Sequence, residues 1–159
     1  MLRITLIVLG RLKEDYLRQA AAEYAKRLQS LCRLETIELH PAPLPDRPSS
    51  AQIDAALETE ARRIEEKLPA GAKLIPLCIE GKNLSSEDFS ARLSDIGMGG
   101  GSVAFVIGSS YGLADRIKRQ ADWRLSLSPM TFPHQMARIL LLEQIYRGLK
   151  ILAGGTYHK

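Results

Sequence analysis

The sequence is poor in the residues that build disulfide frameworks and metal sites. It contains two cysteines, Cys32 and Cys78, and three histidines among 159 residues. The cysteines stand alone in apolar surroundings, and no histidine has a partner at the spacing of a metal ligand. We therefore expect no metal centre, and we interpret both cysteines as small core residues in a reducing compartment.

Long apolar runs are also missing. No stretch reaches the roughly 20 apolar residues that a membrane-spanning helix needs. The start, Met1 to Ile4, lacks the build of a signal peptide and reads instead as the beginning of a strand. These absences favour a cytoplasmic protein that does not associate with membranes.

Two common phosphate-binding motifs are absent as well. Gly108 and Gly112 follow an apolar run but do not meet the G-x-G-x-x-G spacing, and no Walker A sequence occurs. The same loop does match G-x-S-x-G, the serine elbow of many hydrolases, with Ser110 in the nucleophile position. Such an enzyme would need a mobile histidine downstream. Since His134 opens a predicted helix, the hydrolase is the weaker interpretation.

The basic charge is unevenly distributed. The net charge is +4 with a sequence pI of about 9.2. From Val103 onward the chain carries 8 Lys or Arg against 3 Asp or Glu, which leaves the first 102 residues slightly acidic. A local basic surplus suits an anionic partner such as RNA, although a solubilising surface would explain the charge alone.

Strand-like and helix-like segments alternate five times along the chain. This alternation predicts an α/β fold with a parallel sheet covered by helices on both faces, in one domain over 1–159. The expected strands are Leu2 to Leu9, Leu34 to Leu39, Lys73 to Ile79, Val103 to Ile107 and Trp123 to Leu127. The expected helices are Glu14 to Leu28, Ser50 to Leu68, Ser85 to Ile96, Ala114 to Ala121 and Pro133 to Ala153.

Two details of this pattern need explanation. Pro76 falls inside the third expected strand, although proline favours strand edges and bulges. The last helix contains Ile139 to Leu142, which places apolar side chains around most of its circumference. Such a helix is buried against a second subunit or at the centre of one subunit.

The ends of the last two strands are the most informative positions. In open parallel sheets, ligands bind outside the carboxyl ends of the strands. Here those ends break into Gly108 to Gly112 and Ser128 to Phe132. We expect both loops to face a ligand, with Gly108 allowing its close approach.

Several motifs together resemble the RlmH family over the whole chain. They are Phe105-Val106-Ile107-Gly108, Tyr111-Gly112-Leu113, Leu125 to Gln135 with its Thr-Phe-Pro-His block, Leu142 to Arg147, and the terminal Tyr157-His158-Lys159. This family consists of small bacterial methyltransferases of the SPOUT class that methylate N3 of a pseudouridine in large-subunit ribosomal RNA. Ser109 stands where many members carry a second glycine.

The resemblance implies a SPOUT fold with a C-terminal trefoil knot, S-adenosylmethionine as cofactor and a homodimer. No pattern in the sequence predicts the knot by itself, since knots are rare exceptions to the usual rules of chain connection. By motif match, the cofactor-binding residues would be Leu77, Gly108, Leu127, Ser128, Pro129, Met130, Thr131 and Phe132.

The resemblance also draws attention to the C-terminal residues. Methylation of a ring nitrogen requires loss of its proton, and histidine is the side chain that titrates nearest neutrality. We therefore expect His158 to act in catalysis, Tyr157 to stack on the base, Arg147 to stabilise the developing anion and Glu143 to orient Arg147. A frayed tail is the ordinary alternative.

Basic residues on predicted polar faces or loops are candidates for RNA contact. Lys13, Arg27 and Arg138 fit this description. Two other functions stay open at this point: a noncatalytic factor that docks on the ribosome, and a SPOUT methyltransferase that acts on tRNA.

Overall fold

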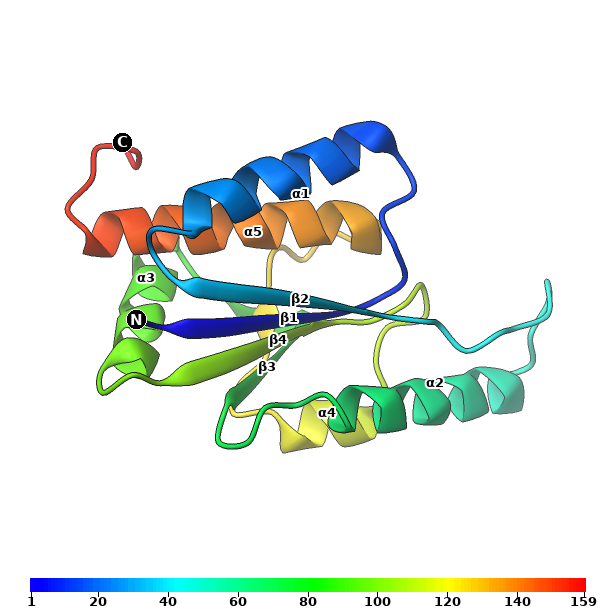
Figure 1. Cartoon of the computed structure of the whole chain (residues 1–159). Coiled ribbons are helices and arrows are strands. Elements are labelled where there is room, and N and C mark those ends of the chain that lie inside the picture. The colour runs from blue at the N-terminus through cyan, green and yellow to red at the C-terminus, as the bar shows by residue number, and fades with distance from the viewer.

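The computed structural model describes all residues, 1–159, and contains five strands and five helices. Figure 1 shows how they are arranged. The strands are β1 (Arg3–Leu9), β2 (Arg33–Leu39), β3 (Lys73–Asn83), β4 (Ser102–Ile107) and β5 (Leu125–Ser126). The helices are α1 (Asp15–Leu28), α2 (Ser50–Glu65), α3 (Ser86–Gly97), α4 (Asp115–Gln120) and α5 (His134–Leu152). The predicted alternation of strand and helix is confirmed.

All strand pairs are parallel, and the strand order is β2-β1-β4-β3-β5. The helices that follow β1 and β4 lie on opposite faces of the sheet, so the order in which the strands are added changes direction between these two neighbours. One predicted strand is corrected. The segment from Trp123 to Leu127 forms only the two-residue β5, because the rest of it turns into the neighbouring loops.

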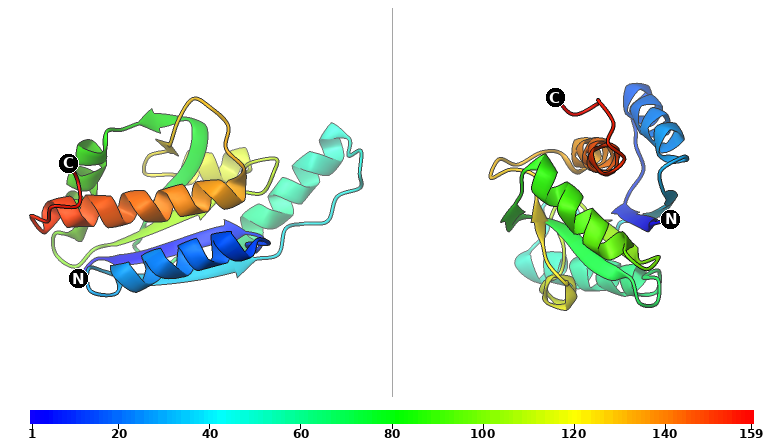
Figure 2. Two further views of the ribbon diagram at one scale, coloured as in Figure 1. Left: turned by 90° about the horizontal axis from the view of Figure 1, so that it is seen from above. Right: turned by 90° about the vertical axis from the view of Figure 1, so that its left-hand side faces the viewer.

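Helices cover both faces of the sheet, as predicted. One face carries α1, α3 and α5, and the other carries α2 and α4 (Figures 1 and 2). Alternate residues of the central strands feed two separate cores. Leu6, Val8 and Phe105 pack on the first face, whereas Ile7 and Val106 pack on the second. The central strands are therefore buried on both sides, which explains their unbroken apolar sequences.

Pro76 lies inside the sheet, but at the point where β3 changes partner. The β3–β4 register ends with the pair Pro76 and Val106, and from Leu77 onward β3 pairs with β5. Proline lacks the N–H of a sheet ladder, so this transition is a suitable position for it. The position of Pro76 inside an expected strand is thereby explained.

The helix starts follow the predicted capping chemistry. Ser49 and Gln52 form a reciprocal capping box at the start of α2, with N···O distances of 2.8 and 3.2 Å. At α3, the Ser85 hydroxyl accepts the backbone N–H of Asp88 at 3.0 Å. Both bonds satisfy amide groups that the first turn of a helix leaves free.

The last helix, α5, lies on the sheet between α1 and α3 (Figures 1 and 2). Leu141, Leu142 and Ile145 are buried by these neighbours and the sheet. Thus much of the apolar circumference of α5 is covered within one subunit, and burial of these residues requires no partner. No helix in the structure combines the length and the apolar character needed to cross a bilayer.

Gly81 allows β3 and β5 to approach closely. A Cβ atom at this position would lie 2.8 Å from the carbonyl carbon of Leu125 and 2.9 Å from the backbone nitrogen of Ser126. Lys82 donates its backbone N–H to the Arg124 carbonyl at 2.8 Å across the same crossing. Because β5 leads directly into Leu127, this backbone contact fixes where the following loop begins.

We predict that Gly81→Ala lowers the free energy of unfolding by about 1–3 kcal/mol, since the added methyl group has no space against the β5 backbone. Urea denaturation measures the change. Gly97→Ala is the matched control, because a Cβ at Gly97 meets nothing closer than 3.9 Å. Equal stabilities of the two variants would contradict the proposed role of Gly81.

Candidate functional site

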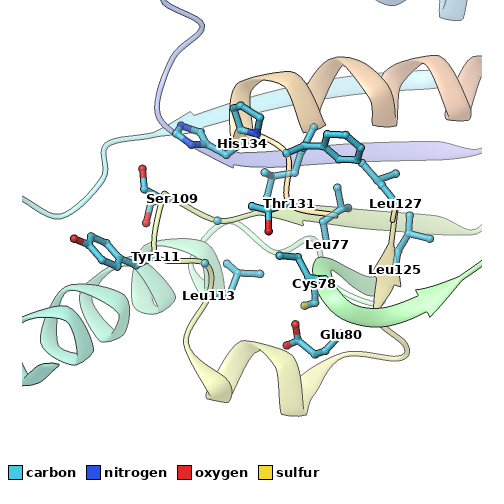
Figure 3. A pocket seen from close by; sticks show the side chains of 18 of the residues that line it. Leu77, Cys78, Glu80, Ser109, Tyr111, Leu113, Leu125, Leu127, Thr131 and His134 are labelled. Carbon is cyan, nitrogen blue, oxygen red and sulfur yellow. The ribbon is translucent and has the colours of Figure 1, made fainter. Parts of the chain in front are cut away.

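A cavity of about 850 Å³ opens at the carboxyl ends of β3 and β4 and beside β5. It lies where ligands bind in open parallel sheets, and its volume is in the range of small-molecule sites. Figure 3 shows that side chains from three strand ends and from the start of α5 converge on it. The predicted residues that line it are Leu77, Gly108, Leu127, Ser128, Met130, Thr131 and Phe132. Pro129 belongs to the same loop but does not line the cavity.

Gly108 has a steric role within its own loop, in addition to the expected close approach of a ligand. A Cβ atom at Gly108 would lie 2.2 Å from the carbonyl oxygen of Gly112 and 3.0 Å from Cγ of Leu113. Gly112, with φ of 82°, donates its N–H to the Ser109 carbonyl at 2.9 Å and closes the turn. Gly108 therefore permits the loop to fold back on itself, and a larger residue would distort the cavity wall even without a ligand.

The loop between β5 and α5 is shaped by its own serines. The hydroxyl of Ser126 donates to the Ser128 carbonyl at 3.0 Å, and the Ser128 hydroxyl accepts the Met130 N–H at 3.0 Å. Asn83 in β3 donates to the Ser126 carbonyl at 3.1 Å. These bonds hold the loop open over the cavity, with Met130 and Phe132 exposed by 73% and 38%. Both side chains present apolar surface at the cavity mouth.

Ser109 is held by a buried carboxylate that sequence reasoning missed. Glu60 of α2 is only 4% exposed. One of its oxygens accepts the Ser109 hydroxyl at 2.9 Å, and the other accepts the Ala42 N–H at 3.0 Å. The Ser109 hydroxyl thus ties the β4 loop to α2. No sequence signal joins the two residues, which are 49 positions apart.

Charged residues form another wall of the cavity that was not predicted. Lys118 of α4 and Glu80 of β3 form an ion pair at 2.8 Å. The hydrogen bond with Lys118 lowers the pKa of Glu80, and the same bond raises the pKa of Lys118. Next to them, burial raises the pKa of the Cys78 thiol to about 11, which keeps it protonated and inert.

The serine-elbow hydrolase gains no support from this geometry. Ser110 is exposed and makes no hydrogen bond with a histidine or a carboxylate. Burial, and next the charge of Lys13, lower the pKa of His134, which lines the same cavity but forms no hydrogen bond with Ser110. No base therefore activates Ser110 in the structure. No cluster of three or more His, Cys, Asp or Glu side chains is arranged to hold a metal ion.

The predicted catalytic residues form one cluster at the far end of α5. Glu143 is its centre: it accepts Nε and Nη2 of Arg147 at 3.0 and 2.6 Å and the Tyr157 hydroxyl at 3.2 Å. The Arg147 guanidinium lies over the Tyr157 ring, 4.7 Å from its centroid. Tyr157 also packs edge-on against Tyr146 at 4.8 Å. The tail is thus docked on α5, which argues against a frayed terminus.

His158 bridges two elements in this cluster. Its Nδ1 lies 3.3 Å from Nη1 of Arg147, and its Nε2 lies 2.7 Å from Glu87 of α3. Arginine only donates, so Nδ1 accepts and Nε2 carries the proton toward Glu87. The hydrogen bond from His158 lowers the pKa of Glu87.

The cluster and the cavity are separated by the length of α5. His134 at the first residue of this helix lines the cavity, whereas the tail follows its last turn (Figures 1 and 3). The 19 residues of α5 span about 28 Å at 1.5 Å per residue. Within one subunit, the two groups of predicted site residues therefore do not meet.

The candidate RNA-binding residues lie in different environments. Lys13 is exposed in the loop after β1. Arg27 pairs with Glu23 at 2.8 Å and lies 5.7 Å from the ring centroids of Tyr24 and Tyr146. Arg138 was expected on a polar face, and this placement is corrected. Its side chain is 11% exposed and is paired with Glu38 at 2.7 Å, because the start of α5 packs beside β2.

A family model described as "Predicted SPOUT methyltransferase" matches residues 2–158. The chain belongs to this family. It is 45% identical over 159 residues to "Ribosomal RNA large subunit methyltransferase H" of Clostridium kluyveri, covering 99% of this chain and 100% of that protein. The protein of the same name from Clostridioides difficile is 43% identical with the same coverage. The predicted family is confirmed.

Solved structures show the same fold at low sequence identity. A probable methylase family protein from Haemophilus influenzae is 15% identical, with a TM-score of 0.53 over 99% of this chain and 70% of that one. A probable methyltransferase from Bordetella pertussis is 16% identical, with a TM-score of 0.53 over 93% of both chains. The arrangement of sheet and helices therefore occurs in other solved structures.

We predict that Glu60→Leu lowers the free energy of unfolding by about 1–3 kcal/mol, because the Ala42 N–H and the Ser109 hydroxyl lose their acceptor. Glu60→Gln is the control, since it keeps an acceptor oxygen of the same reach and should cost less. Urea denaturation of both variants measures the difference. An equal loss in the two variants would show that side-chain volume, and not hydrogen bonding, sets the stability at this position.

Proposed function

We propose that this protein transfers a methyl group from S-adenosylmethionine to N3 of a pseudouridine in large-subunit ribosomal RNA. Membership of the SPOUT family and the names of its full-length relatives support ribosomal RNA methylation. The observation that carries the cofactor assignment is the strand-end cavity, because the motif loops that resemble the family converge on it. A protein that works on ribosomes is expected in the cytoplasm.

The residues of the cavity suit S-adenosylmethionine. Leu77, Leu125 and Leu127 offer apolar surface for an adenine ring, and the loop backbones after β4 and β5 offer polar groups for its edges. Glu80 and Lys118 add charged groups for the polar parts of the ligand. When bound, the cofactor supplies a methyl group on a sulfonium sulfur. An in-line nucleophile can attack the methyl carbon, and the sulfur is then the leaving group.

The tail cluster supplies the chemistry that the target ring needs. N3 of the base gives up its proton and forms a bond to the methyl carbon. The bond between sulfur and that carbon breaks, so that the cofactor would become a neutral thioether. We assign acceptance of the proton to Nδ1 of His158, which gives up its hydrogen bond from Arg147, and stabilisation of the ring anion to Arg147. Glu143 holds the guanidinium through two hydrogen bonds, and Tyr157 offers a ring for stacking on the base.

Because cavity and tail lie at opposite ends of α5, we infer a homodimer with composite sites. Met130, Phe132 and Met136 are exposed near the cavity and give an apolar surface for a second subunit. In an antiparallel pair of α5 helices, each tail reaches the cavity of the other subunit. Each site then consists of one subunit's cavity and the partner's tail.

The trefoil knot is part of the same proposal. The loops after β4 and β5 lie around one cavity, and β5 crosses close to Gly81 after the chain has passed through α4. These features are compatible with a C-terminal segment threaded through a preceding loop, as the family resemblance implies. The threading would hold the cofactor loops against each other.

Cofactor binding has a direct test in isothermal titration with S-adenosylmethionine. Thr131 lies among the cavity side chains in Figure 3, so Thr131→Trp should fill the cavity and abolish binding while the protein stays folded. Met98→Trp, at a residue that is 72% exposed, is the size-matched control and should bind as the parent does. A parent protein that gives no binding heat would favour a noncatalytic ribosome-binding factor.

Substrate class is tested separately by transfer of a labelled methyl group. We expect label in the large-subunit RNA of ribosomes and none in isolated tRNA. Label in tRNA alone would support the SPOUT tRNA methyltransferase instead.

The composite site is tested by mixing two inactive variants. Removal of Tyr157 to Lys159 should eliminate methyl transfer but spare cofactor binding, whereas Thr131→Trp should eliminate cofactor binding and, with it, methyl transfer. A mixed dimer retains one intact cavity facing one intact tail, so activity should return on mixing. If heterodimers form and every mixture stays inactive, the two subunits do not share a site.

A further inference from the structure

The loop between β1 and α1, residues 10–14, is held unusually firmly for a surface connection. Gly10, with φ of 100°, donates its N–H to the Leu39 carbonyl at 2.7 Å. Nη1 of Arg18 donates to the carbonyls of Leu12 and Lys13, both at 2.8 Å. The loop therefore has a fixed backbone before any partner arrives.

The same loop is fastened to the start of α5. The Lys13 N–H is bonded to the Gln135 side-chain oxygen at 2.9 Å. Leu12 is 6% exposed, and the space left between this loop and the first turn of α5 is only about 10 Å³. A gap of that size holds about one water molecule, so the loop and the helix are in close contact on this side. The loop is thus fastened to the helix whose first residue, His134, lines the cavity.

Two cations on this rigid loop are free. Arg11 and Lys13 stand on either side of the buried Leu12, both are exposed, and neither forms an ion pair. The other arginines in the adjoining groove of about 1030 Å³ are engaged, Arg18 with Asp15 and Arg138 with Glu38. The groove therefore offers unneutralised positive charge at the loop itself.

The free cations adjoin the proposed reaction centre. His134 lines the cofactor cavity, and a Cβ at Gly10 would lie 3.9 Å from its Nε2. The charge of Lys13 contributes, after burial, to the lowered pKa of His134, which reflects the same proximity. A nucleic-acid strand that meets this loop would pass directly beside the mouth of the cavity.

We propose that Arg11 and Lys13 form a phosphate clamp that holds the substrate RNA strand next to the nucleotide to be methylated. The inference rests on the proposed RNA methylation and names the surface that positions the substrate. Both residues contact backbone phosphates, so they contribute affinity and register without reading sequence. Because the loop is already ordered, little conformational entropy is lost when the RNA binds.

The test measures ribosome binding as a function of salt for the double variant Arg11→Gln/Lys13→Gln. Loss of two single-strand phosphate contacts should reduce the slope of log affinity against log salt by about 1.4. When the salt concentration is raised from about 50 to about 200 mM, both proteins lose affinity for ribosomes. The fold-loss of the variant should be roughly seven times smaller than that of the parent. The double variant should bind S-adenosylmethionine with the same affinity as the parent protein, which calorimetry measures.

The control removes the same charge from the opposite end of the sheet. Arg33 and Lys67 are exposed and unpaired, so Arg33→Gln/Lys67→Gln should keep the parental slope. Equal slopes for the two double variants would overturn the clamp, even if both methylate ribosomes. A parent protein that neither binds ribosomes nor transfers a methyl group to them would overturn the proposed function together with the clamp.

Discussion

The candidate site depends on the close backbone contact between β3 and β5. At Gly81 the two strands approach so closely that no side chain fits between them. This contact places the two-residue β5 at the edge of the sheet and sets the starting point of the loop 127–132. A second close contact, of Gly108 with the Gly112 carbonyl, shapes the opposite wall. Two glycines thus define the cavity by allowing the chain to pack against itself.

The second constraint is the length of α5. Its first residue, His134, lines the cavity, and its end carries the cluster around Glu143 and Arg147. A straight helix of this length holds the two groups apart within one subunit, while its packing against α1 and α3 leaves it no freedom to bend back. In the proposed antiparallel dimer, the cavity of one subunit would lie next to the tail of the other. The same helix then also fixes the loop that carries Arg11 and Lys13, through Gln135.

The sequence predicted the elements that depend on local patterns. Apolar runs indicated β1 and β4, serine caps indicated the starts of α2 and α3, and the motif loops indicated most of the cavity lining. Contacts between residues that are distant in the sequence could not be predicted from these local patterns. The bond between Ser109 and Glu60 and the burial of Arg138 against Glu38 depend on how α2 and β2 pack, and a helical or strand period carries no information on either. The role of Gly108 in cofactor binding stays a prediction, and its close contact with the Gly112 carbonyl appeared only in three dimensions.

The central claim is that each reaction centre combines the cavity of one subunit with the tail of the other. A crystal structure of the protein with S-adenosylmethionine tests this most directly. The account predicts a cofactor enclosed by Leu77, Gly108 and the loop 127–132, with His158 of the partner subunit facing its sulfonium methyl group. A cofactor bound elsewhere, or one facing the tail of its own subunit, would contradict it.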